Sequence, residues 1–274
     1  MKKQRHSFIY ILLIVFFSSL IIGSSFLLVQ RLLTDQEYEK DTKSLKSLIK
    51  EPEVSHAESA ETSSTALKTD TENEETSSSM KADYKSRYAD LISQNSEFLG
   101  WIRIEDTNID LPVVWRKNDN DFYLHHGFDL TESVYGVPFL GGNCDPTPGS
   151  SCNNYVIYGH HMKTGLVFSN LEKYRDQSFA DTHPDVTFNT IYEDGIYEVF
   201  GACAIGVDDD SNFQYYNETS MDSKEFTSFV KKVKERSLIK SDIEPVYGDR
   251  LLTLSTCEYT HTNGRFVLFA KKKN

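Results

Sequence analysis

A cysteine and an arginine stand eight positions apart near the end of the chain, where they would suit a thiol nucleophile and its oxyanion stabiliser. Apolar and β-branched residues fill 250–256 and 265–270, so we predict two strands of a hairpin. In that hairpin Arg265 lies beside Cys257, where a cation favours the thiolate and donates hydrogen bonds to a developing oxyanion. Each residue alone has a structural explanation, a buried thiol or an exposed charge, and the pairing favours chemistry.

The strand that leads to Cys257 carries small polar side chains on the cysteine's face. Because side chains alternate along a strand, Leu251, Thr253, Ser255 and Cys257 share one face. A packed core would favour larger apolar groups at these positions. We therefore expect this row to form the floor of a groove.

One histidine is placed to act as a proton donor. His160 follows Val156-Ile157-Tyr158-Gly159, so a strand that ends at a glycine would hold the imidazole rigidly where it could protonate a leaving amine. The adjacent His161 points the opposite way and is expected to be structural.

Other polar clusters do not predict a metal site. His125 and His126 could mimic a metal pair, but they lack a third ligand and are expected at the domain surface. The run 208–210 is three aspartates without the glycine and glutamate of an EF-hand loop, so we expect a solvated loop.

The remaining cysteines have separate expected roles. Cys203 lies in an apolar strand and is expected to be a buried small hydrophobe. Cys144 and Cys152 bracket a loop rich in Pro and Gly, and an external location would permit a disulfide between them. Their spacing matches no zinc pattern.

The elements that must position these residues are mostly short strands. Glycine, asparagine, aspartate and proline separate the strands, which predicts an all-β barrel or sandwich. A helix is expected near Tyr84 to Ile92, and another at Ser223 to Arg236, where apolar residues share one face. The expected strands are 101–104, 109–114, 155–158, 185–189, 195–206, 250–256 and 265–270.

The N-terminal region predicts a membrane anchor. Residues 8–29 are almost wholly apolar, which suffices to cross a hydrocarbon core. The basic residues in 1–7 keep that tail in the cytoplasm, so the remainder would lie outside the cell. A cleaved signal peptide is the alternative, and the length of the apolar run disfavours it.

Composition divides the rest of the chain into two parts. Residues 30–80 are rich in Glu, Ser, Thr, Lys and Asp, which predicts a disordered extracellular stalk. A local helix is expected near Leu45, Leu48 and Ile49, with no core for it to dock on. Residues 81–274 suit one globular domain. The formal net charge of −12 argues against nucleic acid as a partner.

Three motifs in this order resemble the sortase family, the membrane-anchored cysteine transpeptidases of Gram-positive bacteria. They are the Thr-Leu-Ser-Thr-Cys strand that ends at Cys257, the Tyr158-Gly159-His160 element, and Arg265. The likeness covers about residues 81–274. The early helix, the Tyr123-Leu124-His125-His126 segment and the inserted helix at 223–236 are similar to class B members.

This resemblance implies an eight-stranded β-barrel and a two-step acyl transfer without a metal or an organic cofactor. Cys257 would attack a carbonyl in the C-terminal sorting signal of a surface protein, Arg265 would hold the oxyanion and His160 would protonate the departing amine. An amine of a peptidoglycan precursor or of a pilin would then resolve the thioester. The residues implied to bind substrate are Thr253, Ser255, Tyr215 and Tyr216.

Two other kinds of protein remain as alternatives. An L,D-transpeptidase is also a β-rich cell-wall cysteine enzyme, but its motif has glycine directly before the cysteine and arginine two positions later. Here Thr256 precedes Cys257. A non-catalytic anchored surface binding protein would use Cys257 as a structural residue.

Overall fold

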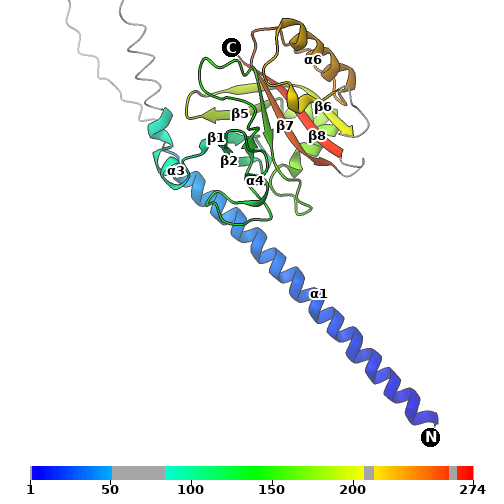
Figure 1. Cartoon of the computed structure of the whole chain (residues 1–274). Helices are drawn as coiled ribbons and strands as arrows, with labels where there is room; N and C mark the ends of the chain where they lie inside the picture. The colour runs from blue at the N-terminus through cyan, green and yellow to red at the C-terminus, as the bar shows by residue number, and fades with distance from the viewer. Residues whose placement is uncertain (1, 51–83, 207–212, 259–263, 274) are drawn as a thin grey trace, which may run out of the picture. The chain divides into compact units, whose positions relative to one another are not determined.

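The computed structural model describes residues 2–50, 84–206, 213–258 and 264–273 (Figure 1). The chain divides into two compact units, Met1–Ser44 and Leu45–Asn274. The second unit contains every strand of the described chain. It therefore holds the elements that can position a site.

Eight strands close into a barrel in the order β1-β2-β3-β4-β7-β8-β6-β5. The predicted mostly β fold with an eight-stranded barrel is confirmed. The strands are β1 (Phe98–Arg103), β2 (Asp110–Trp115), β3 (Phe139–Leu140), β4 (Asn154–Tyr158), β5 (Asp185–Thr190), β6 (Ile196–Gly206), β7 (Leu251–Glu258) and β8 (Gly264–Lys272).

The predicted hairpin lies in the middle of this order. Strand β7 pairs antiparallel with β8 and parallel with β4 on its other side. Residues 251–256 of β7 are all buried, so side chains on both faces of this strand are covered. The strand that ends at Cys257 is thus fixed on both edges and both faces.

The predicted inserted helix, α6 (Ser223–Arg236), is confirmed. Asp222 caps its first turn by accepting hydrogen bonds from two backbone N–H groups, and Glu225 completes a capping box. Its apolar face is buried and packs on β6, where a side chain at Gly201 would come within 2.6 Å of Val233 Cγ1. The buried residues of that face are Phe226, Phe229, Val230 and Val233.

The N-terminal region differs from the expected stalk. Helix α1 runs from Lys2 to Ser47, so the part of the expected stalk from residue 30 to Ser47 is helical. Leu45, Leu48 and Ile49 pack against a buried cluster of the barrel unit, although we expected no core for docking there. Their apolar spacing therefore did indicate a helix with a buried face. Residues 51–83 lie outside the described part of the chain.

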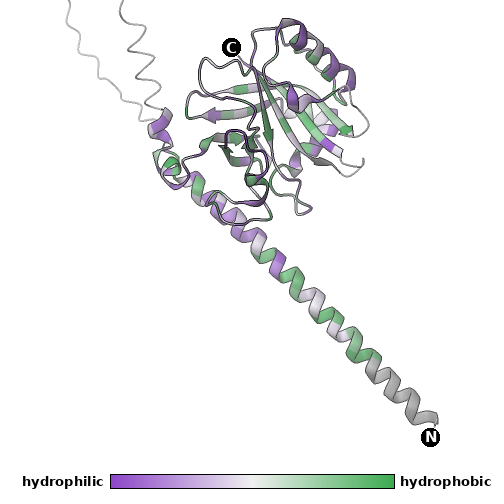
Figure 2. Cartoon of the chain, viewed as in Figure 1, coloured by the Kyte–Doolittle hydropathy of each residue, from purple (hydrophilic) through white to green (hydrophobic). Residues whose placement is uncertain are grey.

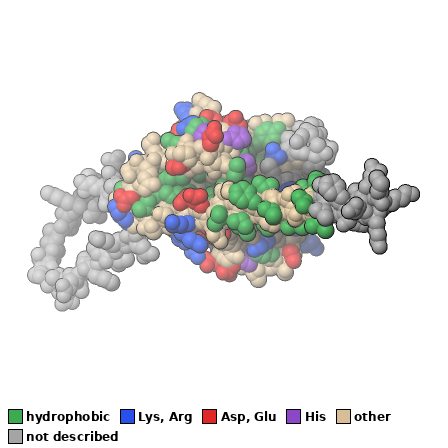
Figure 3. Space-filling view, turned by 90° about the horizontal axis from the view of Figure 1, so that it is seen from below, with side chains coloured by type: hydrophobic (Ala, Val, Ile, Leu, Met, Phe, Trp, Pro, Cys, Tyr) green, Lys and Arg blue, Asp and Glu red, His purple; other side chains and the backbone are tan. Residues whose placement is uncertain are grey.

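Hydropathy varies along α1 (Figure 2). The stretch Leu13–Ser47 contains a window of mean hydropathy 2.1, long and apolar enough to cross a membrane. Its large apolar side chains are exposed from Leu13 to Leu33, and the view from below shows exposed hydrophobic groups in a band (Figure 3). A helix of this kind is compatible with an anchor or with a signal sequence.

The sequence predicted one of the short helices and missed the other short elements. Helix α3 (Ala89–Gln94) is the expected early helix. The unexpected elements, besides the two-residue strand β3, are α4 (Phe122–His125), the 3-10 helices η1 (Ser169–Arg175) and η2 (Tyr215–Asn217), and α5 (Gln177–Thr182).

Candidate active site

The pairing of three strands brings the three motifs together. In β4, Tyr158 lies opposite Ser255 of β7, and the N–H of Gly159 donates to the Ser255 carbonyl over 3.1 Å. Cys257 lies two residues farther along β7 and pairs with Arg265 of β8. The chain that leaves β4 toward His160 therefore runs alongside the strand that leads to Cys257.

His160 is half-buried and held on two sides. Its Nε2 lies 2.7 Å from the carbonyl oxygen of Leu124, and its own carbonyl accepts a hydrogen bond from the N–H of Phe168 over 3.0 Å. The preceding Gly159 is required by packing, because a Cβ there would lie 2.7 Å from the Phe168 ring. The ring is thus held by a contact from α4, and the His160 backbone by a contact from the segment before η1.

Tyr158 connects this histidine to the arginine of β8. Its side chain borders both buried clusters of the barrel unit. Burial raises the pKa of Tyr158 well above its usual range, nearby Tyr215 and Tyr216 raise it further, and the charge of Arg265 lowers it. The phenol therefore stays neutral, and Arg265 is near enough to act on it electrostatically. Arg265 itself is partly buried and donates to the Gly264 carbonyl over 3.0 Å.

The four residues expected to bind substrate lie in one neighbourhood. Thr253 and Ser255 are buried, and their hydroxyls bond to Asn154 Oδ1 and to the Tyr215 hydroxyl, each over 2.8 Å. Tyr215 is also buried, while Tyr216 is partly exposed and packs edge-on against it. The structure therefore brings together the residues expected to form the groove floor, and the side chains of Thr253 and Ser255 are covered.

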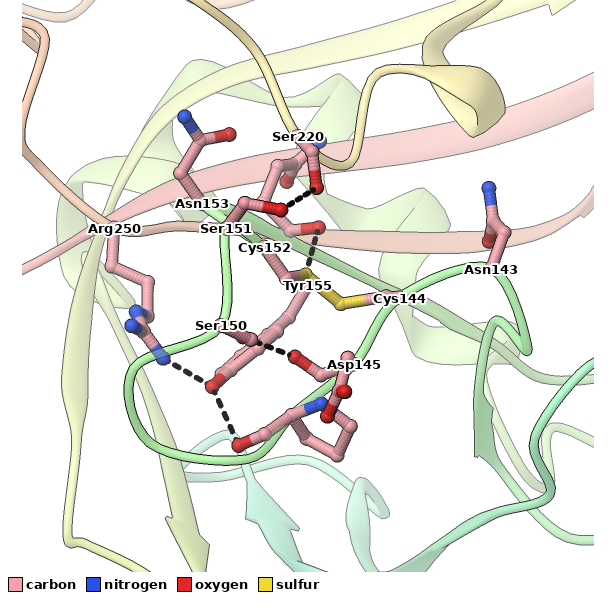
Figure 4. The surroundings of a disulfide bond; sticks show 12 residues. Asn143, Cys144, Asp145, Ser150, Ser151, Cys152, Asn153, Tyr155, Ser220 and Arg250 are labelled. Carbon is pink, nitrogen blue, oxygen red and sulfur yellow. Dashed lines mark hydrogen bonds between the residues drawn. A yellow bond between two sulfur atoms is a disulfide. The ribbon is translucent and has the colours of Figure 1, made fainter.

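A disulfide closes the loop before β4. Cys144 and Cys152 are bonded, with their Cα atoms 5.7 Å apart (Figure 4). Directly after Cys152, Asn153 and Asn154 hold the segment 218–221.

Asn153 binds this segment through both main-chain and side-chain groups. Its N–H donates to the Thr219 carbonyl over 2.9 Å, its Nδ2 donates to the Met221 carbonyl over 2.7 Å, and its Oδ1 accepts from the Met221 N–H over 3.0 Å. Asn154 adds a bond from Nδ2 to the Glu218 carbonyl over 2.9 Å. These bonds fix the stretch that follows Tyr215.

Cys203 is buried and carries no disulfide, as expected for a small core residue. Burial raises the pKa of its thiol to about 12, so this sulfur stays protonated and unreactive at neutral pH.

The remaining histidines show structural contacts. His161 Nε2 lies 3.6 Å from a Glu172 carboxylate oxygen. His126 stacks on the Phe122 ring, whereas His125 is exposed. Within the described ranges, no group of three or more His, Cys, Asp or Glu side chains is arranged to hold a metal ion. The aspartates at 208–210 lie outside those ranges.

Sequence patterns missed two parts of this neighbourhood. The acceptor for His160 is the main-chain carbonyl of Leu124, and any residue type provides such a carbonyl. Asn154 was equally unmarked, since a single asparagine at a strand start carries no specific signal. The Tyr123-Leu124 segment stood out only through its resemblance to class B members.

A family model described as a sortase domain matches residues 102–273 of the chain. This chain belongs to the sortase family. Sortase B of Listeria monocytogenes is 34% identical over 187 residues, which cover 66% of this chain and 72% of the relative.

Solved structures agree with this assignment. Clostridium perfringens sortase B is 30% identical, covers 68% of this sortase and 99% of its own chain, and has a TM-score of 0.62. The Staphylococcus aureus sortase B–substrate complex has a TM-score of 0.69 at 24% identity and covers 88% of this sortase and 99% of its own chain, which supports the fold. The sortase is therefore a class B-like cysteine transpeptidase. The L,D-transpeptidase and non-catalytic readings are set aside.

Proposed function

We propose that this sortase is a membrane-anchored enzyme that cleaves the C-terminal sorting signal of surface proteins and transfers the acyl group to an amine of the cell wall or of a pilin. The pairing of Cys257 with Arg265 beside the strand that leads to His160 carries this proposal. The fixed registers of β4, β7 and β8 support this proposal, because acyl transfer requires the reacting groups to be held in a constant arrangement.

In the first step the Cys257 thiolate attacks a peptide carbonyl of the signal, and Arg265 donates hydrogen bonds to the oxyanion that forms. His160 gives a proton to the departing amine as the C–N bond breaks, and a thioester remains. In the second step an acceptor amine attacks the thioester, its proton passes to His160, and the thiolate leaves. Thr253, Ser255, Tyr215 and Tyr216 would shape the site that receives the signal.

The anchor belongs to the same proposal. The apolar stretch of α1 would cross the membrane, and the basic residues at 2, 3 and 5 would remain in the cytoplasm. The barrel unit would then face surface proteins outside the cell. The chain between the apolar stretch and residue 80 would form the stalk between the membrane and the barrel.

Mass analysis of the full chain in detergent tests the chemistry. The chain is incubated with a panel of sorting-signal peptides, and we expect a covalent adduct of the N-terminal peptide fragment on Cys257. Adding amines, such as oligoglycine or a lysine side chain, should release the fragment as a new amide.

The matched control is Cys203→Ala, which removes a buried thiol and should retain the adduct. Cys257→Ala should abolish the adduct and leave the fold intact. An adduct on Cys257→Ala would contradict the mechanism, as would a wild-type chain that captures no peptide and whose Cys257 resists a thiol-reactive probe.

A further inference from the structure

A short helix supplies the acceptor that fixes His160. Helix α4 has four residues, too few to be stable by itself. The Leu124 carbonyl within it lies 2.7 Å from His160 Nε2. Because a carbonyl oxygen can only accept, Nε2 must carry a hydrogen in this arrangement. The second proton of an imidazolium is then gained and lost at Nδ1.

A buried hydroxyl next to Leu124 holds the helix in place. The Tyr123 side chain is 2% exposed. Its hydroxyl donates to Glu97 Oε2 over 2.6 Å and lies 3.0 Å from Asn95 Nδ2. Asn95 Nδ2 also donates to the Phe128 carbonyl over 2.9 Å, so Asn95 links Tyr123 of α4 to the chain that follows this helix.

An arginine completes the support from the other side. Arg116 Nε donates to both carboxylate oxygens of Glu97, over 2.8 and 2.9 Å. Its guanidinium also lies 3.6 Å from the centroid of the Phe122 ring, on the first residue of α4. Both residues that precede Leu124 are thus tied to the Glu97 carboxylate, directly or through Arg116.

The backbone of Gly136 approaches the Leu124 carbonyl and the His160 ring closely. A Cβ at Gly136 would lie 2.4 Å from the Tyr123 carbonyl oxygen, 3.1 Å from the Leu124 oxygen and 3.3 Å from His160 Cδ2. The backbone there therefore approaches both partners of the hydrogen bond closely. Small displacements of α4 cannot be absorbed on this side without moving the histidine ring.

We infer that Tyr123, through its hydrogen bond to Glu97, is a positioning residue for His160. It holds the Leu124 carbonyl where that carbonyl keeps the proton on Nε2 and leaves Nδ1 for proton transfer. Tyr123 acts through Leu124 and touches neither substrate nor the reacting atoms. The inference rests on the proposed function because it assumes that His160 is the proton donor.

The test compares Tyr123→Phe with wild type in the full chain in detergent, with nitrogen-15 in its histidines. We expect wild type to show an Nε2–H proton on His160 that exchanges slowly with water, assigned by its absence in His160→Gln. In Tyr123→Phe this signal should be lost to exchange. The rate of thioester formation at saturating peptide should fall about 10-fold, with KM nearly unchanged.

Tyr174→Phe is the matched control. Tyr174 is also a buried tyrosine, and its hydroxyl donates to the main-chain carbonyl of His183 over 2.8 Å. This variant should change neither the signal nor the rate. If Tyr123→Phe fails to fold, Glu97→Gln keeps the side-chain volume at a partly exposed position and should move both readouts in the same direction.

Retention of the slow Nε2–H signal in folded Tyr123→Phe would overturn the inference, whether or not the rate falls. A wild-type chain that forms no thioester would instead contradict the proposed function. The proton signal would still decide whether Tyr123 fixes the His160 ring, so the two failures are distinguishable.

Discussion

The segment near the end of β4 and the segment near its start are held in different ways. On one side, α4 depends on Tyr123, Asn95, Glu97 and Arg116, a network with charged members. On the other side, 218–221 is held by neutral amide bonds from Asn153 and Asn154 next to a disulfide.

The two kinds of support have different effects: the α4 network sets the position of the carbonyl that contacts His160, and the disulfide side restrains the chain. A charged network is strong when complete, but removing one member leaves buried groups such as Tyr123 and Asn95 without a partner. A disulfide and main-chain bonds restrain the chain whatever the ionic conditions. We therefore expect changes on the α4 side to affect catalysis more than stability, and changes on the disulfide side to do the reverse.

Two glycines with positive φ give the largest expected contrast. Gly136 (φ 58°) lies against Tyr123 and Leu124, whereas Gly149 (φ 87°), in the disulfide loop, has no atom within 4 Å of an added Cβ. Gly136→Ala should lower the acylation rate about 100-fold, because the new methyl group displaces the acceptor of His160. Gly149→Ala should lose about 1 kcal/mol through backbone strain and keep its rate.

Single-turnover acylation and denaturant unfolding of the full chain in detergent measure both effects. The two tryptophans, Trp101 and Trp115, lie in β1 and β2 and report on the barrel. Equal losses of acylation rate in the two variants would show that backbone strain at positive φ explains the loss. The α4 side and the disulfide side would then not differ in their effect on catalysis.

Removing the disulfide should give the next largest effect, on stability. The bond closes a loop with a sequence separation of 8, and closure of such a loop stabilises a fold by about 2–3 kcal/mol. The double variant Cys144→Ser, Cys152→Ser should lose that amount in denaturant unfolding, while its acylation rate at a temperature where it is folded changes less than about 3-fold.

Wild type treated with a reductant should match the double variant, and the variant itself should not respond to reductant. A rate loss as large as that of Gly136→Ala would mean that the disulfide side also positions the reacting groups.

The candidate site could be proposed from the sequence because it depends on residue types at close spacing. Cys257 and Arg265 are local to one hairpin, and strand pairing then fixes their register. His160 could be placed because Gly159 marks the end of a strand. The disulfide followed from two cysteines that bracket a short loop.

The parts that could not be predicted depend on groups without a residue signature. The Leu124 carbonyl is ordinary main chain, and β3 is two residues long, below the length at which alternation can be seen. The length of the helix beyond residue 30 was missed because charged and polar residues suggested disorder. The spacing of Leu45, Leu48 and Ile49 indicated a local helix but not the buried cluster on which it packs. Packing partners distant in sequence decided each of these cases.

The smallest expected effect is on stability at alkaline pH, and it also distinguishes the α4 side from the disulfide side. Burial, followed by the hydrogen bond to the Glu97 carboxylate, raises the pKa of Tyr123 far above its value in the unfolded chain, which is about 10. Its contribution to stability is therefore complete below pH 10 and is lost as the pH rises from there toward the folded pKa. Each such tyrosine removes about 1.4 kcal/mol per pH unit in that window.

Tyr123→Phe should abolish this share, so its stability relative to wild type should be about 1 kcal/mol better at pH 11 than at pH 10, because the unfolded tyrosine is already half ionised at pH 10. Unfolding curves at pH 8, 10 and 11 measure the difference. Tyr247→Phe, at a side chain that is 55% exposed, is the control and should keep the wild-type slope. The disulfide side has a buried phenol of its own, because the Tyr155 hydroxyl donates to the Pro146 carbonyl over 3.4 Å and burial raises the pKa of Tyr155. The double serine variant should nevertheless keep the Tyr123 share of the slope, so adding Tyr123→Phe to it should flatten the slope as much as it does in wild type. A smaller flattening would mean that the disulfide loop supports the Tyr123 network, and the two sides would then have to be treated as one.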